Sequence, residues 1–308
     1  MNYDLIILGG GPGGVAAGIY AARKKIKTLL ITDSFGGQSL VSDEIQNWIG
    51  TSSISGLELA KNLEAHLRAQ EDIDIREGDF AERTERIDES GFRVHARQGE
   101  AFEARALLLA TGSRRRKLGV PGEEKLEGKG IAYCATCDAP LFKGKRVAVV
   151  GGGNSGLEAV VDLFPYAPKV YLLHRRDTLK GDAVTQEKIK NNPDQATILY
   201  DAEVQEIRGD KWVSGLVYKD KKTGEVHTLE VEGIFTEIGS VPNSEIVSDF
   251  VERNTYGEIV VDPKTQQSSL PGIWAAGDVT DCFYKQNNIS VGDAVKAILN
   301  INAFLHGK

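Results

Sequence analysis

The sequence predicts an α/β protein with two Rossmann-like, three-layer nucleotide-binding domains, the second inserted into the first. Three observations predict this fold class: 308 residues suit about two domains, a pattern of strand, glycine cluster, helix and strand occurs twice, and glycine-bearing joints bracket its second copy. We place the first domain at residues 1–113 and 244–308 and the inserted domain at residues 114–243. The 34 glycines are clustered rather than spread, which indicates backbone that approaches a ligand closely.

The composition excludes several classes of protein. There are 44 acidic and 37 basic residues, and the net charge of −7 argues against nucleic acid as a partner. With 41% apolar and 26% charged residues, the chain is globular rather than disordered or fibrous. Residues 5–22 are uncharged, but six glycines and a proline among them argue against a membrane span or signal peptide. Three cysteines without an even disulfide framework predict a cytoplasmic protein.

The first elements form a strand, helix, strand unit. A buried strand at residues 5–8 leads into a GxGxxG motif at residues 9–14, an alanine-rich helix and a second strand at residues 28–31. The glycines permit a tight turn and place a pyrophosphate at the helix N-terminus. Asp33, nineteen residues beyond the motif, is spaced to bind the hydroxyl pair of a ribose. The alternative, a glycine-rich turn without a ligand, is disfavoured by the matching flanks.

Four further segments predict antiparallel side sheets. They lie at residues 92–96, 106–110, 213–219 and 226–231. The second of them ends in a glycine turn at Gly112, which lets the backbone pass close to a ligand.

A candidate redox pair lies at the start of the inserted domain. Cys134 and Cys137, with two residues between them, can close a small disulfide and reopen it by thiolate attack. Asp138 follows directly, where a proton donor is needed. We expect no metal, because structural zinc takes four ligands and Cys282 is the one other cysteine of the sequence. An inert buried pair is the remaining alternative.

A second strand, helix, strand unit follows the cysteines. Its GxGxxG motif, at residues 151–156, lies between apolar strands at residues 146–150 and 170–173. Arg175 stands nineteen residues beyond the motif, next to Arg176, so the spacing of the first unit recurs with the charge reversed. Guanidinium groups hold a 2′-phosphate through bidentate hydrogen bonds, which predicts NADP(H) here. The alternative is a solvated basic strand end.

Another glycine turn lies near the C-terminus. Gly277 and Asp278 follow a short apolar strand, and the carboxylate is suited to the ribityl or phosphate region of a flavin. A simple strand-to-helix turn is the alternative. We interpret Cys282 as a small core residue.

Eight motifs together resemble those of one enzyme family. They are GGGPGG at 9–14, GGQ at 36–38, ATGS at 110–113, CATCD at 134–138, GGGNSGLEA at 151–159, HRR at 174–176, IGSVPN at 238–243 and AAGDVTD at 275–281. Nearly end to end, the chain resembles the low-molecular-weight thioredoxin reductases. It is also similar to the C-terminal reductase portion of the alkyl hydroperoxide reductase flavoprotein, whose extra N-terminal disulfide domain we do not expect here.

The resemblance implies two cofactors. FAD in the first domain would be held by Gly9, Gly11, Gly14, Asp33, Gly37, Gln38, Asn47, Gly112, Gly277, Asp278 and Gln286. NADPH in the inserted domain would be held by Gly151, Gly153, Asn154, Ser155, Glu158, His174, Arg175, Arg176 and Lys180. Within the second set, the two arginines and the lysine would contact the 2′-phosphate, and the glutamate would lie near the nicotinamide half.

The resemblance also implies the reaction, that of an NADPH-dependent thioredoxin-disulfide reductase. Electrons would pass from NADPH through FAD to Cys137, while Cys134 attacks the disulfide of thioredoxin or a similar small protein. Asp138 would donate and accept protons. The family rotates its inserted domain, and we expect the hinge near residues 114–117 and 239–243. The resemblance further implies a homodimer formed through the flavin domain.

Two departures from the family keep alternatives open. Lys180 replaces an arginine, which retains the charge but loses the planar fork and softens the preference for NADPH. Residues 287–288 are asparagines where the family has small or apolar residues. A same-fold disulfide reductase that uses ferredoxin or NADH, or a reductase of a peroxiredoxin system, therefore remains an alternative. A ferredoxin–NADP reductase, which lacks the dithiol, and a non-enzymatic nucleotide sensor are less favoured.

Overall fold

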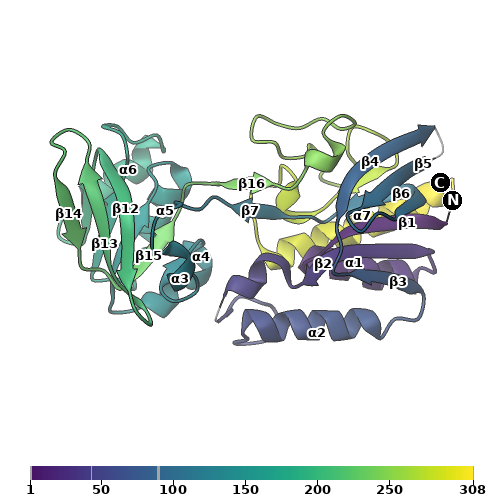
Figure 1. The fold of residues 1–308 in the computed structure, drawn as a ribbon, viewed down its shortest axis with the longest axis horizontal. Coiled ribbons are helices and arrows are strands. Elements are labelled where there is room, and N and C mark those ends of the chain that lie inside the picture. Colours follow the sequence, from purple (N-terminus) through teal and green to yellow (C-terminus); the bar gives the residue numbers. More distant parts are fainter. Residues whose placement is uncertain (1, 43, 89–90, 308) are drawn as a thin grey trace. The chain divides into compact units, whose positions relative to one another are not determined.

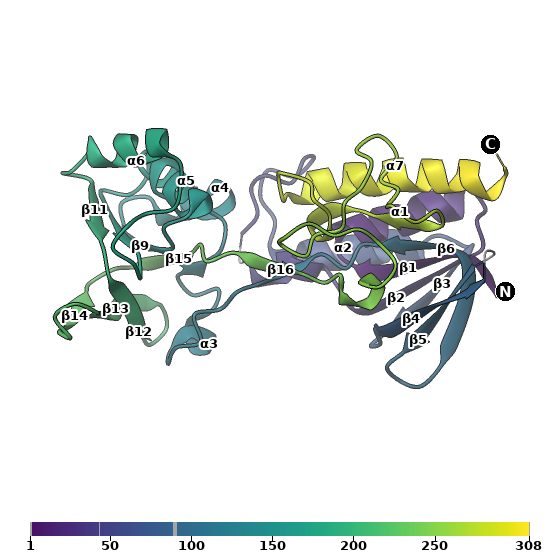
Figure 2. The ribbon, with the colours of Figure 1, turned by 90° about the horizontal axis from the view of Figure 1, so that it is seen from above.

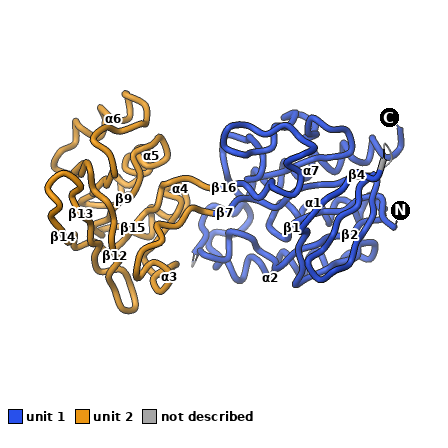
Figure 3. Tube along the Cα trace, turned by 45° about the horizontal axis from the view of Figure 1, so that its top comes forward, with its two compact units in different colours: residues 1–114, 241–308 blue, residues 115–240 orange. Residues whose placement is uncertain are grey.

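The computed structural model describes residues 2–42, 44–88 and 91–307. The chain forms two compact units: unit 1 from residues 1–114 and 241–308, and unit 2 from residues 115–240 (Figure 3). The outer limits expected for the first domain, residues 1 and 308, lie outside the described residues. Unit 2 is one continuous stretch of chain, whereas unit 1 needs both ends of the sequence.

The core of unit 1 is a seven-stranded mixed sheet (Figure 1). Its strands are β1 (Tyr3–Gly10), β2 (Thr28–Phe35), β3 (Ile73–Glu77), β4 (Ala81–Asp88), β5 (Gly91–Ala96), β6 (Ala101–Leu109) and β17 (Ile273–Ala275). Their order is β3-β2-β1-β6-β5-β4, with β17 paired to β6. The pairs that β4 makes with β5, and β5 with β6, are antiparallel, and the pairs among β1, β2, β3, β6 and β17 are parallel.

Strand β6 corrects one prediction. Residues 106–110 are predicted to lie in an antiparallel side sheet, but residues 106–109 pair parallel with β1 in the main sheet, and residues 107–109 also pair parallel with β17 on the other side. Only the first half of β6 pairs antiparallel, with β5. Burial follows the same division, because residues 106–109 are fully buried whereas residues 101–105 are mixed in exposure. A continuous apolar run is typical of a strand covered on both faces.

Helices α1 and α7 lie side by side and share a hydrophobic core with the sheet (Figure 2). The helices of unit 1 are α1 (Pro12–Arg23), α2 (Gly56–Arg68) and α7 (Asn287–Leu305), with the 3₁₀ helices η1 (Gly37–Val41), η3 (Glu245–Val247) and η4 (Gly277–Val279). Proline suits the first turn of α1, where the missing N–H has no intrahelical partner to lose. Helix α2 begins after Ser55, whose hydroxyl accepts the amide N–H of Glu58 at 3.1 Å.

Unit 2 is also built on a sheet with parallel strands and helices, but its sheet is smaller than that of unit 1. Its five-stranded parallel sheet, in the order β11-β10-β9-β15-β8, consists of β8 (Ile131–Ala132), β9 (Arg146–Val150), β10 (Lys169–Leu173), β11 (Ala196–Leu199) and β15 (Gly233–Thr236). The antiparallel side sheet predicted at residues 213–219 and 226–231 is confirmed, as β12 (Ala202–Gly209), β13 (Val213–Asp220) and β14 (Val226–Leu229). The helices are α3 (Glu123–Leu126), α4 (Ala135–Asp138), α5 (Asn154–Leu163) and α6 (Ala183–Lys190), with the 3₁₀ helix η2 (Ala139–Phe142).

The chain crosses between the units twice, through β7 (Ser113–Arg115) and β16 (Ser240–Pro242), which pair with each other. Beyond β7 the chain is fixed by Glu123, whose buried carboxylate accepts the amide N–H groups of Leu118 at 2.9 Å and Gly119 at 2.7 Å. Among the described residues, no helix is both long and apolar enough to cross a membrane.

Candidate nucleotide and dithiol sites

The two glycine turns have the same backbone geometry. Gly9, in the last two residues of β1, and Gly151, directly after β9, have φ of +110° and +135°, in the left-handed region that favours glycine. A Cβ atom on Gly14 would overlap the carbonyl oxygen of Gly9, and one on Gly156 would overlap that of Gly151. The first and last glycines of each motif are therefore required for the strand to turn tightly into its helix.

Unit 1 has a pocket of ≈ 830 Å³ at this turn. Eight of the residues predicted for FAD line it: Gly9, Gly11, Asp33, Gly37, Gln38, Gly112, Gly277 and Asp278. They come from the carboxyl ends of neighbouring strands, where open α/β sheets bind ligands. Gly14 lies behind the turn against Gly9, and the pocket lining does not include Asn47 or Gln286.

The pocket fits a dinucleotide such as FAD. Its volume lies within the range of ligand sites. The backbones of Gly11, at the start of α1, and Gly37 pack closely at this wall, because a Cβ on Gly37 would lie 3.2 Å from the Cα of Gly11. Exposed Asp33, at the end of β2, adds the carboxylate suited to a ribose.

Side-chain amides fix the start of α7 beside this pocket. Asn47 donates to the side-chain oxygen of Gln286 at 3.3 Å, and Asn288 donates to the carbonyl of Asn47 at 2.8 Å. Asn287 lines the pocket and donates to the hydroxyl of Ser39 at 3.0 Å. The two unusual asparagines thus hold α7 against Ser39 and Asn47. Asn287 is a pocket residue that no sequence motif assigned, although its place beside Gln286 could have indicated it.

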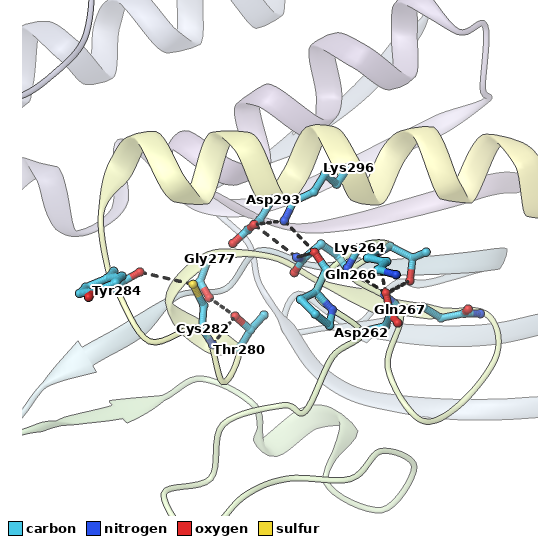
Figure 4. A network of polar contacts seen from close by, with 12 residues as sticks. Asp262, Lys264, Gln266, Gln267, Gly277, Thr280, Cys282, Tyr284, Asp293 and Lys296 are labelled. Atoms are coloured by element: carbon cyan, nitrogen blue, oxygen red, sulfur yellow. Dashed lines mark hydrogen bonds and ion pairs between the residues drawn. The ribbon is translucent and has the colours of Figure 1, made fainter.

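A second polar network supports the turn at Gly277 (Figure 4). The hydroxyl of Thr280 donates to the Gly277 carbonyl at 2.8 Å and accepts the Cys282 amide at 3.3 Å. Farther along, buried Gln266 donates to Asp293 of α7 at 3.3 Å, and Lys296 forms an ion pair with the same carboxylate. Cys282 is half-buried, so the interpretation of this residue as part of the core is wrong.

The predicted phosphate-binding residues of unit 2 gather at the end of β10. Arg175, Arg176 and Lys180 are exposed there, whereas His174 is buried with its ring against Gly152. Burial is the main cause that lowers the pKa of His174, and the nearby cations add to it. The backbone amide of Lys180 donates to the Gly152 carbonyl at 2.7 Å, which holds this loop against the glycine turn.

Residues of α5 complete this edge of unit 2. The side-chain oxygen of Asn154 accepts the amide of Asp182 at 2.8 Å, and so joins the glycine turn to the start of α6. Ser155 and Glu158 are exposed on α5, and Gly153 precedes this helix as its N-cap. The predicted nucleotide residues therefore lie together at the carboxyl ends of β9 and β10.

Cys134 and Cys137 form a disulfide at the single turn of α4, with their Cα atoms 5.3 Å apart. The carbonyl of Cys134 accepts the amides of Cys137 at 3.2 Å and Asp138 at 3.0 Å, which holds the turn closed. Burial raises the pKa of Asp138 to about 6, against the opposing effect of Arg115. A carboxyl that titrates near neutral pH is suited to proton transfer. Among the described residues, no group of three or more His, Cys, Asp and Glu side chains is arranged to hold a metal.

Glu237 is a second half-buried carboxyl beside this turn. Burial raises the pKa of Glu237 to about 7, while Arg115 and the amide of Ala135 act in the opposite direction. No sequence motif assigned this residue. The internal repeat could have indicated it: Glu237 stands two residues before Gly239, just as Ala110 stands two residues before Gly112 in unit 1.

Two α/β units with matching glycine turns, one of them bearing a disulfide, define a nucleotide-dependent disulfide oxidoreductase. The family model described as "Pyridine nucleotide-disulphide oxidoreductase" matches residues 3–297. The chain belongs to this family.

Similar proteins of known structure or sequence support this family assignment. The crystal structure of thioredoxin reductase from Streptococcus pyogenes has a TM-score of 0.92 at 33% identity, over 100% of both chains. The F subunit of the alkyl hydroperoxide reductase of Pseudomonas aeruginosa is 45% identical over 99% of this chain and 58% of its own length. A protein described as NADH dehydrogenase from Bacillus subtilis is 42% identical over 98% of this chain and 58% of its own. The chain thus spans under three fifths of these two relatives, and the predicted two-domain fold and family resemblance are confirmed.

Proposed function

We propose that the chain is an FAD-containing, NADPH-dependent reductase of thioredoxin or a similar small disulfide protein. The observation that carries this proposal is the disulfide of Cys134 and Cys137 in the same unit as the arginine-bearing glycine turn. The structural similarity to a thioredoxin reductase along the whole chain supports it.

The pocket of unit 1 is the proposed FAD site. The lining residues proposed to bind FAD are Gly9, Gly11, Asp33, Gly37, Gln38, Gly112, Gly277 and Asp278. Gly14 packs against Gly9, and the hydrogen bond between Asn47 and Gln286 supports the start of α7. FAD, when bound, supplies the chemistry that accepts a hydride from a nicotinamide and delivers two electrons to a disulfide. The residues of the chain bind the pyrophosphate on the start of α1 and the ribose on Asp33.

The glycine turn of unit 2 is the proposed NADPH site. Arg175, Arg176 and Lys180 bind the 2′-phosphate by charge-assisted hydrogen bonds. His174 holds the strand end against Gly152 rather than reaching solvent. Gly151, Gly153, Asn154 and Ser155 shape the turn, and Glu158 orients the nicotinamide half.

The dithiol acts on the partner protein by exchange. In this proposal Cys137 takes up the electrons that open the disulfide, and the Cys134 thiolate then attacks the disulfide of the partner to form a mixed disulfide. The Cys137 thiolate resolves the mixed disulfide, which restores the internal disulfide and releases the partner as a dithiol. Asp138 supplies and removes the protons that these steps require.

Because the proposed NADPH site and the dithiol share unit 2 while the FAD pocket lies in unit 1, the mechanism needs rotation of unit 2. We place the hinge at residues 114–117 and 239–243, around the paired strands β7 and β16. We also propose a homodimer formed through unit 1, which light scattering at micromolar concentration would test.

A second candidate is a peroxiredoxin-system reductase driven by NADH. Two observations favour it: the similarity to a component of alkyl hydroperoxide reductase and to a protein described as NADH dehydrogenase, and Lys180 in place of a forked arginine.

Anaerobic titration of the purified yellow protein separates these proposals. NADPH and NADH are added in turn while flavin absorbance is followed, and thioredoxin or a peroxiredoxin-linked disulfide protein is then offered. Bleaching by NADPH, with two extra electrons taken up by the disulfide of Cys134 and Cys137 and turnover with thioredoxin, is the expected result. Equal or faster bleaching by NADH favours the second candidate, and bleaching by dithionite or reduced ferredoxin alone contradicts both.

A further inference from the structure

Glu237 directly follows β15, and the proposed function does not use it. Its amide donates to the carbonyl of Val150 at 2.9 Å, which fixes the backbone at the carboxyl edge of the sheet of unit 2. In unit 1, Ala110 has the same place, since its amide donates to the carbonyl of Leu8 at 2.9 Å. Ala110 lines the pocket of unit 1, so the equivalent place in unit 2 is a ligand-facing edge that here carries a carboxyl.

The surroundings of this carboxyl connect it to the disulfide. It accepts a hydrogen bond from the amide of Ala135, the first residue of α4, and Ala135 directly follows Cys134. The charged groups that face it are Arg115 from β7, Asp138 from α4 and Glu158 from α5. Two carboxylates and one guanidinium thus surround a third carboxyl, and burial raises the pKa of Glu237 to about 7.

We propose that Glu237 is a positioning residue of the dithiol, which holds the α4 turn through Ala135 and stores one of the two protons that accompany disulfide reduction. This inference rests on the proposed function, in which Cys134 and Cys137 cycle between disulfide and dithiol. Reduction breaks the S–S bond and adds two electrons, from the reduced cofactor in the enzyme or from dithiothreitol in a test. One proton forms a thiol on one sulfur, and Glu237 holds the second, so the other sulfur stays a thiolate.

The expected consequence is a pH-dependent thiolate. A protonated Glu237 leaves the thiolate undisturbed, whereas an ionised Glu237 repels it and raises the pKa of the thiol. Replacing the carboxyl by an amide therefore has no effect at low pH, where Glu237 is protonated, and increases the thiolate fraction at the intermediate pH where Glu237 is ionised and the thiol is only partly ionised. A role confined to holding the α4 turn would change reactivity by the same factor at every pH.

The test is the alkylation rate of the full-length, flavin-loaded protein after reduction by dithiothreitol and its removal, with iodoacetamide from pH 5.5 to 9. The ratio of Glu237→Gln to wild-type rates is expected to be about 1 at pH 5.5, to rise to about 3 between about pH 7 and 8, and to return toward 1 at the pH where the reacting thiol is fully ionised in both proteins. Glu237→Asp, which keeps a carboxyl, should retain the wild-type pH dependence. Glu230→Gln, the same change at an exposed residue of unit 2, should give a ratio of 1 throughout.

A ratio for Glu237→Gln that does not vary with pH overturns the inference and leaves the proposed function intact. If dithiothreitol does not reduce Cys134 and Cys137 in the wild type, both the inference on Glu237 and the proposed function are overturned. If Glu237→Gln fails to fold, the wild type and Glu237→Asp are compared instead. A pH profile with one inflection, from the thiol alone, in both of them then overturns the inference.

Discussion

The two units turn from strand to helix through the same backbone and differ at the residues around it. Gly10 of unit 1 faces the side chain of Thr32, whereas Gly152 at the same place in unit 2 faces the side chain of His174. One residue farther, Asp33 in unit 1 corresponds to Arg175 in unit 2. In this fold the glycine turn determines where a dinucleotide binds, and the residue at the end of the following strand determines which dinucleotide is preferred.

The strands β6 and β15, which pair with β1 and β9, show the same division. The place before the next glycine turn is Ala110 in unit 1, where the pocket needs room, and Glu237 in unit 2, where the disulfide needs proton chemistry. Both residues donate their amide to the central strand in the same way. The same backbone position therefore lines the pocket in unit 1 and carries a carboxyl beside the disulfide turn in unit 2.

The largest expected effect tests whether chemistry is confined to unit 2. Cys137→Ser should lower disulfide reductase activity by about 10³-fold or more, because the internal disulfide can no longer form. Flavin content and bleaching by NADPH should remain. The matched control is Cys282→Ser in unit 1, and an equal loss there would contradict the assignment of the dithiol.

The next effect tests the equivalence of the two turns. Gly14→Val and Gly156→Val each drive a side chain into a backbone carbonyl, at a cost of about 3 kcal/mol or more, or about 100-fold in binding. Gly14→Val should lose FAD, measured by absorbance per protein, whereas Gly156→Val should keep FAD and lose NADPH. Gly292→Ala, an exposed glycine of α7 whose Cβ would meet open space, is the control. Loss of both cofactors in either variant would contradict the assignment of one cofactor to each glycine turn.

The charge reversal at the strand ends predicts a smaller, selective effect. Arg175→Ala combined with Arg176→Ala should raise the KM for NADPH by about 10- to 100-fold, because two charge-assisted phosphate contacts are lost. The KM for NADH should change less than about twofold. Steady-state kinetics with both nucleotides measure this, and an equal rise for the two would mean that the arginines do not bind the 2′-phosphate.

Half-buried Asp138 predicts a pH-dependent stability. Its pKa is about 6 in the folded chain against an ordinary 3.8, so the folded state binds a proton more tightly than the unfolded state. The associated stability is fully present below about pH 4 and is lost as the pH rises through 6. Asp138→Asn should therefore stabilise the protein at pH 8 by up to about 3 kcal/mol and far less near pH 4, as thermal melts at several pH values would show. Exposed Asp210→Asn should show no such pH trend.

Lys180→Arg is the smallest expected effect. A planar guanidinium can make two parallel hydrogen bonds to a phosphate where an ammonium makes a point contact, so the KM for NADPH should fall about two- to threefold. The KM for NADH serves as the internal control. No change for either nucleotide would place the Lys180 side chain outside the phosphate site.

Much of the fold could be predicted because its signals are local. The glycine spacing, the apolar strands and the residues nineteen positions beyond each motif all lie within short windows. The parallel pairing of strand β6 could not be predicted from its own window, since its partner β17 is more than 160 residues away. Glu237 was missed because the burial that raises its pKa to about 7 arises only when β15 packs beside α4.

The insertion of one unit into the other also sets an order of assembly during synthesis. The ribosome completes unit 2 as one continuous stretch, while unit 1 still lacks β17 and α7. The pocket includes Gly277 from the η4 turn and Asn287 from α7, so it cannot close until the last segment has emerged. Cofactor loading should thus be the final folding event, and a nascent chain stalled before residue 270 should carry a folded dithiol unit without flavin.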